Sequence, residues 1–333
     1  MTSVSTVPRP VMLSCDPGSV IDHPSGCLAL SPKNERFTAA GILGFVAYRE
    51  HGRHRIVLGG VHAPVAQQPE LLDRFLASSE TGGRRVLVVQ LRARQAPLFL
   101  ERGFTVNQLG TSFGLTLRGF TLDGSRKMQL RNKISRARRA GLRVVEVGRE
   151  LPRDDGTLAA LHAVSRAWLE GKGEKELDFM VGEIGRPDEA WRRIFVTLDR
   201  EDRPVGFITY VPAWGAAPGY LHDLTRRLPD ASPGVMELCH ARALERMAAE
   251  GVPCVHFGLT PFVVASAELP GASRWAALAV RTLYRYGSAL YPAASQAQYK
   301  LKWGPDIVER EYIAARPLSI RAVFDLLRLT RVI

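Results

Sequence analysis

The chain has 333 residues, of which 46% are hydrophobic and 23% are charged. These proportions are typical of a folded globular protein of about two domains, and they exclude wholesale disorder, a collagen-like repeat and a small disulfide-rich domain. The 45 lysine and arginine residues exceed the 33 aspartate and glutamate residues, which gives a formal net charge of +12. This surplus favours an anionic partner: a nucleic acid, an acidic membrane surface or a phosphorylated ligand.

The cysteines indicate a reducing environment and no metal site. Cys15, Cys27, Cys239 and Cys254 form no CxxC pair and have no histidine cluster nearby in the sequence. Neither a zinc site nor a disulfide framework is therefore expected. The N-terminal residues lack the pattern of a secretory signal, and the apolar runs are far shorter than the roughly 20 residues of a spanning helix. We expect a cytoplasmic protein, which would reach any lipid from the inner surface of the membrane.

The first half of the chain predicts strands interspersed with short helices. Residues 1–36 are rich in Pro, Ser and Gly and are expected to form an irregular arm. Further along, apolar β-branched runs predict strands, and apolar residues three or four apart predict helices. The expected strands are 41–49, 55–60, 84–91, 104–109 and 112–117, and the expected helices are 69–78 and 95–102.

The second half has a similar rhythm. Its expected helices are 125–140, 156–170, 233–250, 273–286 and 318–329, and its expected strands are 142–147, 193–198, 204–211, 219–224 and 254–259. Two such rounds predict an α/β (α+β) fold with mixed, largely antiparallel sheets flanked by helices. We expect a first domain at 37–123, a basic helix and connecting strand at 124–150, and a second, catalytic domain at 151–333.

A long basic stretch is the first functional signal. Met128, Leu130, Ile134 and Ala137 form one apolar stripe, so a helix here can bury that stripe and keep most of its circumference cationic. No acidic residue lies within the stretch, which favours contact with a phosphate backbone over a solvated face paired with acids elsewhere. Its basic residues are Arg126, Lys127, Arg131, Lys133, Arg136, Arg138, Arg139 and Arg143.

A second signal lies at the end of an expected strand. Asp223 and Arg226 are three residues apart there. A carboxylate can hold an ammonium group or accept a proton, and a guanidinium can bind a phosphate or carboxylate. His222 precedes Asp223, but neighbouring residues of a strand face opposite sides, which argues against a direct catalytic pair.

Two further segments carry charged residues that suit anion binding or structural roles. Glu237 lies in the first turn of an expected helix, where a negative charge also suits the helix dipole. Lys300 and Lys302 lie two apart on a segment expected to be extended, so both would point to one face, where they would either clamp an anion or be solvated; Arg310 follows. The helix expected at 318–329 has the pattern of a basic amphipathic helix, for which docking on the domain is favoured over lying on anionic lipid.

Taken in order, these motifs resemble the cytosolic catalytic region of the phosphatidylglycerol lysyltransferase family. The resemblance spans roughly residues 40–315 and implies two tandem GNAT-like (acyl-CoA-acetyltransferase-like) domains. The membrane domain that precedes this region in the family is absent from the sequence, so we expect a stand-alone catalytic region. The matching segments are Leu130-Arg131 to Gly141, Asp223-Leu224-Thr225-Arg226, Gly234-Val235-Met236-Glu237, Phe257-Gly258-Leu259-Thr260-Pro261 and Tyr299-Lys300 to Pro305.

The resemblance implies transfer of an aminoacyl group from aminoacyl-tRNA to a hydroxyl or amine acceptor. Because the aminoacyl ester is already activated, we expect neither a cofactor nor a metal. By position, the resemblance implies catalytic roles for Asp223, Arg226 and Lys302. The implied substrate-binding residues are Glu237, His222, Lys300 and Arg310, and the implied tRNA-binding residues are Arg126, Lys127, Arg131, Lys133, Arg136, Arg138 and Arg139.

The sequence departs from the family pattern near the expected acceptor end. Residues 292–298 lack the usual aromatic residue and Gly-Leu pair, Ile307 stands at a tryptophan position, and the spacing to Arg310 and Tyr312 is shifted. The acceptor therefore stays open between an anionic phospholipid, with peripheral membrane contact, and a small molecule of a biosynthetic pathway.

Two other classes of function stay open. An acyl-CoA-dependent GNAT acyltransferase is disfavoured, because residues 138–141 do not fit a pyrophosphate-binding loop. A non-enzymatic RNA- or membrane-binding module would use the basic stretch and would not need Asp223 or Lys302.

Overall fold

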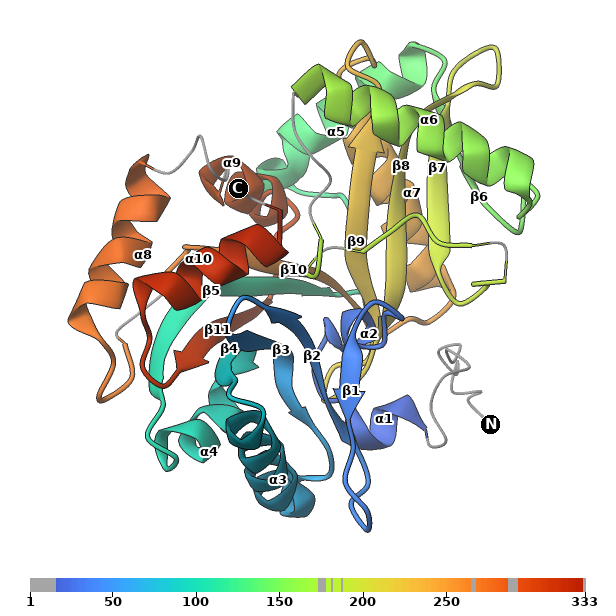
Figure 1. Cartoon of the computed structure of the whole chain (residues 1–333). Helices are drawn as coiled ribbons and strands as arrows, with labels where there is room; N and C mark the ends of the chain where they lie inside the picture. The colour runs from blue at the N-terminus through green and yellow to red at the C-terminus, as the bar shows by residue number, and fades with distance from the viewer. Residues whose placement is uncertain are drawn as a thin grey trace.

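The computed structural model of the protein describes residues 16–172, 178–180, 182–186, 188–264, 268–286 and 293–331. An 11-stranded sheet runs through both halves in the order β1-β2-β3-β4-β11-β5-β10-β9-β8-β7-β6, with helices packed around it (Figure 1). The strands are β1 (Glu35–Phe37), β2 (Phe45–His51), β3 (His54–His62), β4 (Arg85–Arg92), β5 (Thr105–Thr116), β6 (Arg143–Glu146), β7 (Arg193–Leu198), β8 (Pro204–Ala213), β9 (Gly219–Arg227), β10 (Cys254–Pro261) and β11 (Ile307–Ala315).

The helices fill the connections between these strands. None of them, within the described ranges, is both long and apolar enough to cross a bilayer. They are α1 (Pro17–Val20), α2 (Gly26–Ala29), α3 (Gln68–Thr81), α4 (Ala96–Leu100), α5 (Met128–Arg139), α6 (Asp155–Lys172), α7 (Val235–Ala249), α8 (Arg274–Tyr286), α9 (Ala293–Leu301) and α10 (Ile320–Leu329), with 3₁₀ turns at Val65–Gln67, Ala93–Gln95 and Ser125–Lys127.

Each half contains one parallel strand pair joined by a helix. β3 pairs with β4 in parallel across α3, and β9 pairs with β10 in parallel across α7. The other pairings between these strands are antiparallel. The predicted mixed, largely antiparallel fold is therefore confirmed, and its two similar rounds are the two units built around the parallel pairs.

The halves exchange their last strands at the centre of the sheet. β11, from the second half, lies between β4 and β5, and β5, from the first half, lies between β11 and β10. The four strands β4, β11, β5 and β10 are called the seam below. Since one sheet continues through the seam, the expected domain boundaries stay a prediction.

Four local expectations were wrong. Residues 16–36 of the expected irregular arm form α1, α2 and the start of β1, and they bury Ile21 and Ala29 in the core. The two strands expected at 104–117 are one long strand, β5. The segment carrying Lys300 is helical, in α9, and β11 follows where the sequence analysis expected no element. The secondary structure of such segments depends on the strands and helices that they contact, which a local apolar pattern does not indicate.

Helices cover both faces of the sheet (Figure 1). Leu130 and Ile134 of α5 share a core cluster with Leu244 of α7 and Tyr220 of β9. Leu221, the next residue of β9, belongs to the cluster that contains Leu326 of α10. Neighbouring strand residues face opposite sides, so α5 and α10 lie on opposite faces of the sheet.

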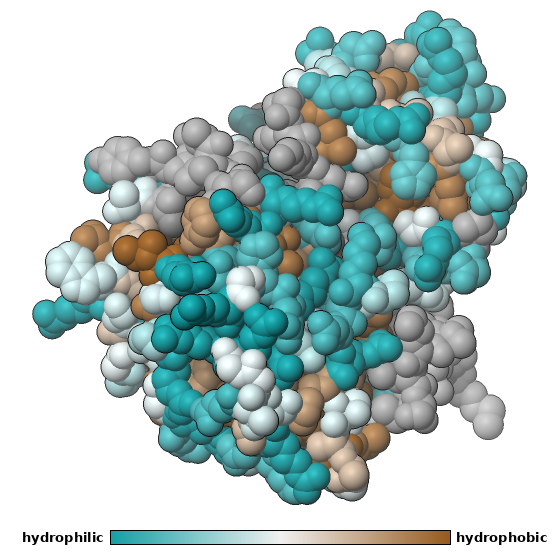
Figure 2. Space-filling view, viewed as in Figure 1, coloured by the Kyte–Doolittle hydropathy of each residue, from teal (hydrophilic) through white to brown (hydrophobic). Residues whose placement is uncertain are grey.

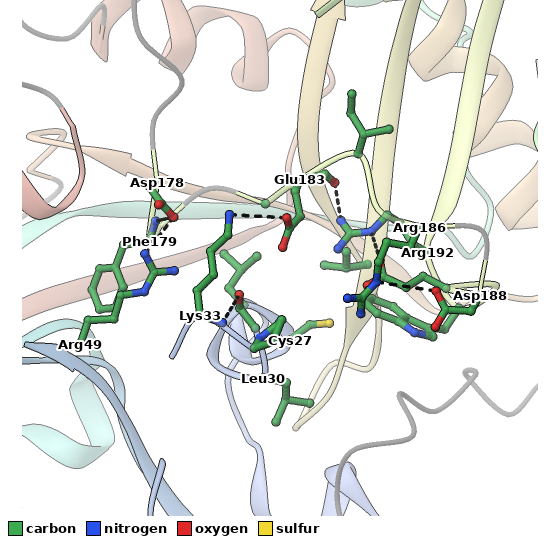
Figure 3. Close-up of a pocket in the computed structure, with 18 of the residues that line it drawn as sticks. Cys27, Leu30, Lys33, Arg49, Asp178, Phe179, Glu183, Arg186, Asp188 and Arg192 are labelled. Carbon is green, nitrogen blue, oxygen red and sulfur yellow. Dashed lines mark hydrogen bonds and ion pairs between the residues drawn. The ribbon is translucent and has the colours of Figure 1, made fainter. Parts of the chain in front are cut away.

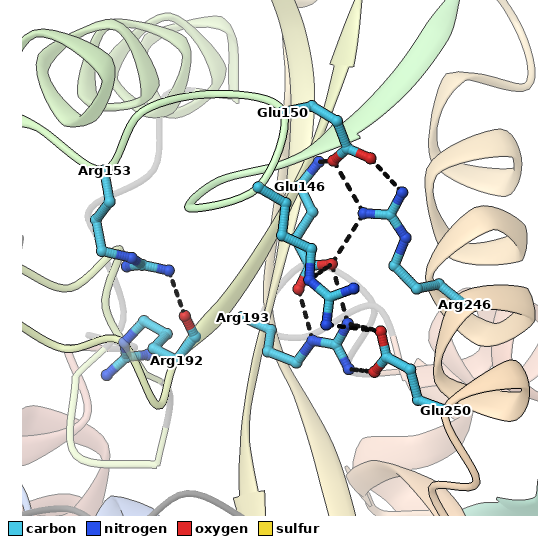
Figure 4. Close-up of polar contacts among 8 residues, drawn as sticks. Glu146, Glu150, Arg153, Arg192, Arg193, Arg246 and Glu250 are labelled. Carbon is cyan, nitrogen blue, oxygen red and sulfur yellow. Dashed lines mark hydrogen bonds and ion pairs between the residues drawn. The ribbon is translucent and has the colours of Figure 1, made fainter.

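A buried network of ion pairs fixes α7 to the edge strands (Figure 4). Arg193 of β7 donates to Glu146 of β6 and to Glu250 at the end of α7, each at 2.6 Å. Arg246 of α7 also donates to Glu146, at 3.0 Å, and to Glu150. Because Arg193 is buried with its charge paired by two carboxylates, the network holds strand and helix in one register.

The residue before α7, Gly234, must be a glycine for two reasons. It precedes α7 with φ +90°, a left-handed conformation that favours glycine. A Cβ atom there would collide with the carbonyl oxygen of Lys133 in α5. Gly251, just past the other end of α7, has φ +75°, but a Cβ atom there would meet nothing within 4 Å.

We expect Gly234→Ala to lower the free energy of unfolding by about 2–4 kcal/mol, because it adds overpacking to the left-handed strain. The matched control Gly251→Ala carries the strain alone and is expected to cost about 1 kcal/mol. Urea unfolding of both variants measures the difference. Equal losses would show that the approach of α5 to α7 imposes no constraint.

Candidate functional site

The basic helix has the predicted form. Leu130, Ile134 and Ala137 of α5 are buried, which leaves the rest of its circumference to solvent. Lys127 and Arg131 donate to backbone carbonyls of residues 121–124. Within residues 126–143, all of which the structure describes, the exposed arginines without an acidic partner are Arg126, Arg136, Arg138 and Arg139. This surface, called the α5 face below, retains net positive charge.

Glu237 joins the α5 face to the end of α9. Its carboxylate accepts from Lys302 at 2.7 Å and from Lys133 at 3.3 Å. Burial opposes the negative charge of Glu237, but the hydrogen bond and charge of Lys302 outweigh it, so its pKa is lowered. Three of the residues singled out from the sequence thus lie together, with two cations on one carboxylate.

A buried histidine cluster lies beside this group. His222 of β9 bonds the Thr225 hydroxyl at 2.6 Å, and its ring centroid lies 5.0 Å from that of His240 in α7. Burial, with the nearby charge of Lys300, lowers the pKa of His222 to about 3, so the ring is neutral at pH 7. His240 Nε2 and Trp303 Nε1 are buried without a hydrogen-bond partner. No sequence motif marks His240, because its approach to His222 exists only in the folded chain.

Lys300 occupies the gap where β9 and β10 diverge. Their parallel pairing covers only residues 254–256 of β10. Beyond it, Nζ of Lys300 donates to the carbonyls of Gly258 and Leu259, at 2.9 Å each. Burial lowers the pKa of Lys300 to about 7. Lys300 and Lys302 therefore do not form the predicted clamp: the helical backbone sends one to β10 and the other to Glu237.

Glu311 is a buried acid on the other side of the seam. It lies at a β-bulge of β11 and accepts a hydrogen bond from Ser112 of β5. Its second oxygen is buried without a partner, and His23 Nε2 lies 3.8 Å from the first. Burial raises the pKa of Glu311 to about 7, against the opposing effects of Ser112, Arg92 and Lys300. The bulge lies in the segment after Ile307 where the spacing departs from the family pattern. Arg310 itself is exposed.

Asp223 and Arg226 are held in separate surroundings. The Asp223 carboxylate is 1% exposed, pairs with Arg192 at 2.8 Å and accepts from the backbone N–H of Gly182 at 2.8 Å. Burial raises its pKa, although Arg192 opposes the shift.

Arg226 stacks on Trp168 of α6 and donates to Ser165. As predicted, His222 and Asp223 contact different groups on opposite sides of β9.

A pocket of about 240 Å³ adjoins Asp223 (Figure 3). Residues from 27 to 33 form one wall, and residues between 178 and 192 form the other. Its rim carries the ion pairs Lys33–Glu183, at 3.5 Å, and Arg49–Asp178, at 2.9 Å. Arg192 lines the pocket and links it to Asp223 behind. This pocket could not be predicted from the sequence, because no recognisable motif marks its walls.

The cysteines and acidic residues give no sign of a metal centre in the described ranges, where no group of three potential ligands gathers. Cys27, Cys239 and Cys254 are buried free thiols, as predicted; Cys15 lies outside the described residues. Burial raises the pKa of the Cys239 and Cys254 thiols to about 12, so both are protonated and unreactive at pH 7.

The buried acid at the bulge makes stability pH-dependent. Between the ordinary pKa of 4.5 and the folded value of about 7, folded Glu311 keeps a proton that the unfolded chain loses. Its contribution to stability is therefore present at low pH and declines as the pH rises through this window.

We accordingly expect Glu311→Gln, relative to wild type, to gain more thermal stability at pH 8 than at pH 4.5, measured as Tm. Glu309→Gln is the control on the same strand. Its carboxylate is partly exposed and paired with Arg92, so no gain is expected. A Glu311→Gln effect independent of pH would contradict the burial of a titrating carboxyl.

Comparison with known proteins places the whole arrangement in a family. A family model described as "Phosphatidylglycerol lysyltransferase, C-terminal" matches residues 18–315. The lysylphosphatidylglycerol biosynthesis bifunctional protein LysX of Mycobacterium leprae is 27% identical over 248 residues, which cover 73% of this chain and 21% of that protein. LysX of Mycolicibacterium vanbaalenii is 32% identical over 171 residues, or 51% of this chain and 15% of that protein. The chain thus spans about a fifth of the length of these curated relatives.

Solved structures share the fold. L-PGS from Bacillus licheniformis superposes with a TM-score of 0.77 at 21% identity, covering 93% of this chain and 92% of that one. A DUF2156 domain from Agrobacterium fabrum gives 0.75 at 21% identity, with 92% and 91% covered. With the family model spanning most of its length, the chain belongs to the family of phosphatidylglycerol lysyltransferase C-terminal regions.

Proposed function

We propose that the chain transfers an aminoacyl group from an aminoacyl-tRNA to a hydroxyl of a phosphatidylglycerol-type acceptor. Family membership and the LysX relatives, named for lysylphosphatidylglycerol biosynthesis, support this reaction. The observation that carries the proposal is structural continuity. Lys133 of the α5 face and Lys302 both pair with Glu237. Lys302 also lies over the ring of Tyr299, which packs against His240 beside His222. The cationic α5 face is thereby joined to the buried histidine cluster.

The reaction needs positioned groups and no further activation. The acceptor oxygen attacks the ester carbonyl, the bond to the terminal ribose of the tRNA breaks, and the ribose oxygen takes up the proton that the acceptor loses. In this proposal Lys133 and Lys302 bind phosphate oxygens while Glu237 fixes their positions. Lys300 titrates near pH 7, so it is able to hold or release a proton during the transfer.

Asp223 acts, in this proposal, through the pocket beside it. Its pairing with Arg192 and Gly182 fixes one wall of the 240 Å³ pocket. The alternating carboxylates and cations of that pocket suit a zwitterionic or cationic group such as an amino acid. Arg226, buried against Trp168, holds α6 on the same strand. The catalytic roles implied for both residues stay predictions.

A soluble acceptor is the second candidate. The observation that favours it is the bulge at Glu311, which adds a buried acid to the seam where the sequence departs from the family pattern. A carboxylic acid at this position would suit an acceptor that donates a hydrogen bond, such as an amine or hydroxyl of a small molecule.

A transfer assay tests the proposal. Total tRNA charged with labelled amino acids is incubated with the protein and with vesicles of phosphatidylglycerol or of phosphatidylcholine alone. Label in the lipid fraction with phosphatidylglycerol supports the lipid acceptor. Label in a small soluble product, formed when cell extract is added, supports the second candidate. If no charged tRNA is consumed under any condition, the proposed donor is wrong.

In the same assay we expect Asp223→Asn to reduce transfer at least tenfold while retaining tRNA binding. The amide keeps the size of the side chain but removes the charge that holds Arg192, and its fold is checked by the circular dichroism spectrum and Tm. Unchanged transfer by a folded Asp223→Asn protein would contradict the role given to this residue.

The α5 face is tested by charge removal. We expect the triple variant Arg136→Gln, Arg138→Gln, Arg139→Gln to weaken tRNA binding and to lower the slope of log affinity against log salt by about 2, since each lost phosphate contact removes roughly 0.7–0.9. Arg143→Gln is the matched control, because Arg143 already pairs with Asp202 at 2.7 Å. Equal effects of the two would argue against a phosphate-binding role for the α5 face. Filter binding over a salt series gives both slopes.

A further inference from the structure

Two amphipathic helices expose large apolar side chains. On α8, Trp275 is 80% exposed and Leu278 is 55% exposed. On α10, Ile320 is 91% exposed and Phe324 is 41% exposed. The favoured expectation for α10, docking on the domain, holds for its other side, where Ala322 and Leu326 are buried. Its outer side remains apolar and uncovered.

Both helices lie over the same face of the sheet. Asn107 of β5 receives and donates hydrogen bonds with Ser273, immediately before α8, at 3.1 and 3.0 Å. Asn107 is the cross-strand partner of Ile313, which shares a core cluster with Leu326 of α10. Directly opposed residues point to the same side of a sheet. Figure 1 shows α8 and α10 on this side, and Figure 2 shows hydrophobic side chains gathered over them.

The charge around these side chains has one sign. α8 contains no acidic residue. The single acid of α10, Asp325, is buried and bonded to His54 at 2.6 Å. The exposed arginines of the two helices are Arg274, Arg281, Arg285, Arg321 and Arg328. Apolar side chains ringed by arginines, with no exposed acid on either helix, are complementary to a surface that offers both negative charge and hydrocarbon.

We infer that this surface, the α8–α10 face, docks on an anionic phospholipid bilayer with both helices in the plane of the interface. The 13 residues of α8 extend about 20 Å, too short to cross a hydrocarbon core of about 30 Å. The insertion is therefore limited to the outer side chains. The inference rests on the proposed function in taking lipid as the acceptor, but binding is measured without tRNA.

Vesicle co-sedimentation tests the inference with the full chain. We expect binding to vesicles of phosphatidylglycerol and phosphatidylcholine, and little to phosphatidylcholine alone. The double variant Trp275→Ser, Ile320→Ser is expected to lower the partition coefficient at least tenfold. Both side chains are exposed, so the fold should persist, which Tm verifies. Val65→Ser is the matched control, because Val65 is 78% exposed away from the two helices.

The electrostatic part is tested separately. The single variants Arg321→Gln and Arg328→Gln should each reduce vesicle binding about fivefold, and high salt should reduce it further. Arg166→Gln, an exposed arginine of α6, serves as the charge control. Absence of vesicle binding, or equal loss in the controls, overturns the inference. The inference is also overturned if the wild-type protein is a dimer and the double variant is a monomer, because the α8–α10 face would then join two copies of the chain. Transfer to a soluble acceptor without vesicle binding would leave the proposed aminoacyl transfer standing and remove this inference alone.

Discussion

The exchange of β5 and β11 is the constraint on which the rest of the structure depends. β11 bonds to β4 on one side and β5 on the other, so the chain must pass from the second half back into the first just before it. α9 and the turn after it make that passage. They carry Lys300 to the carbonyls of Gly258 and Leu259 in β10, and Lys302 to Glu237 of α7. Strand pairing thus positions the lysines, and their sequence spacing does not.

Buried polar groups lie in the seam and in the helices next to it. Lys300 and Glu311 both have pKa values moved to about 7 by desolvation, and His240 and Trp303 each bury a nitrogen without a partner. Such groups cost stability compared with an apolar core. The large apolar clusters on either side offset this cost. Several destabilising buried polar groups gathered in one region, with well-packed apolar cores elsewhere, are typical of a functional site.

Features of the fold and of the site that depend on neighbouring residues in the sequence were predictable, and those that depend on distant residues were not. The α5 face was predicted because a 3.6-residue period and an absence of acids are local properties. The alternating residues Tyr299–Trp303 favoured a strand, but tertiary contacts made them part of a helix and a turn. His240 and Glu311 stood in no motif, and Asp223 meets Arg192 only through the fold. The rhythm of the elements predicted two similar rounds, and the family resemblance implied two tandem domains. The exchange of strands across the seam could not be predicted, because no local pattern in either half indicates which strands pair.

The arrangement also separates two negatively charged partners. The buried side of α5 packs in the core cluster of Tyr220, and the buried side of α10 packs in the cluster of Leu221. The two helices therefore lie on opposite faces of the sheet. A tRNA on one face and a bilayer on the other would not compete for the same arginines or repel each other at close range. In the proposed reaction the groups to be joined must then meet within the sheet. The divergence of β9 from β10 offers that place, because the β9–β10 ladder ends at His256 and Lys300 donates to the β10 carbonyls just beyond it.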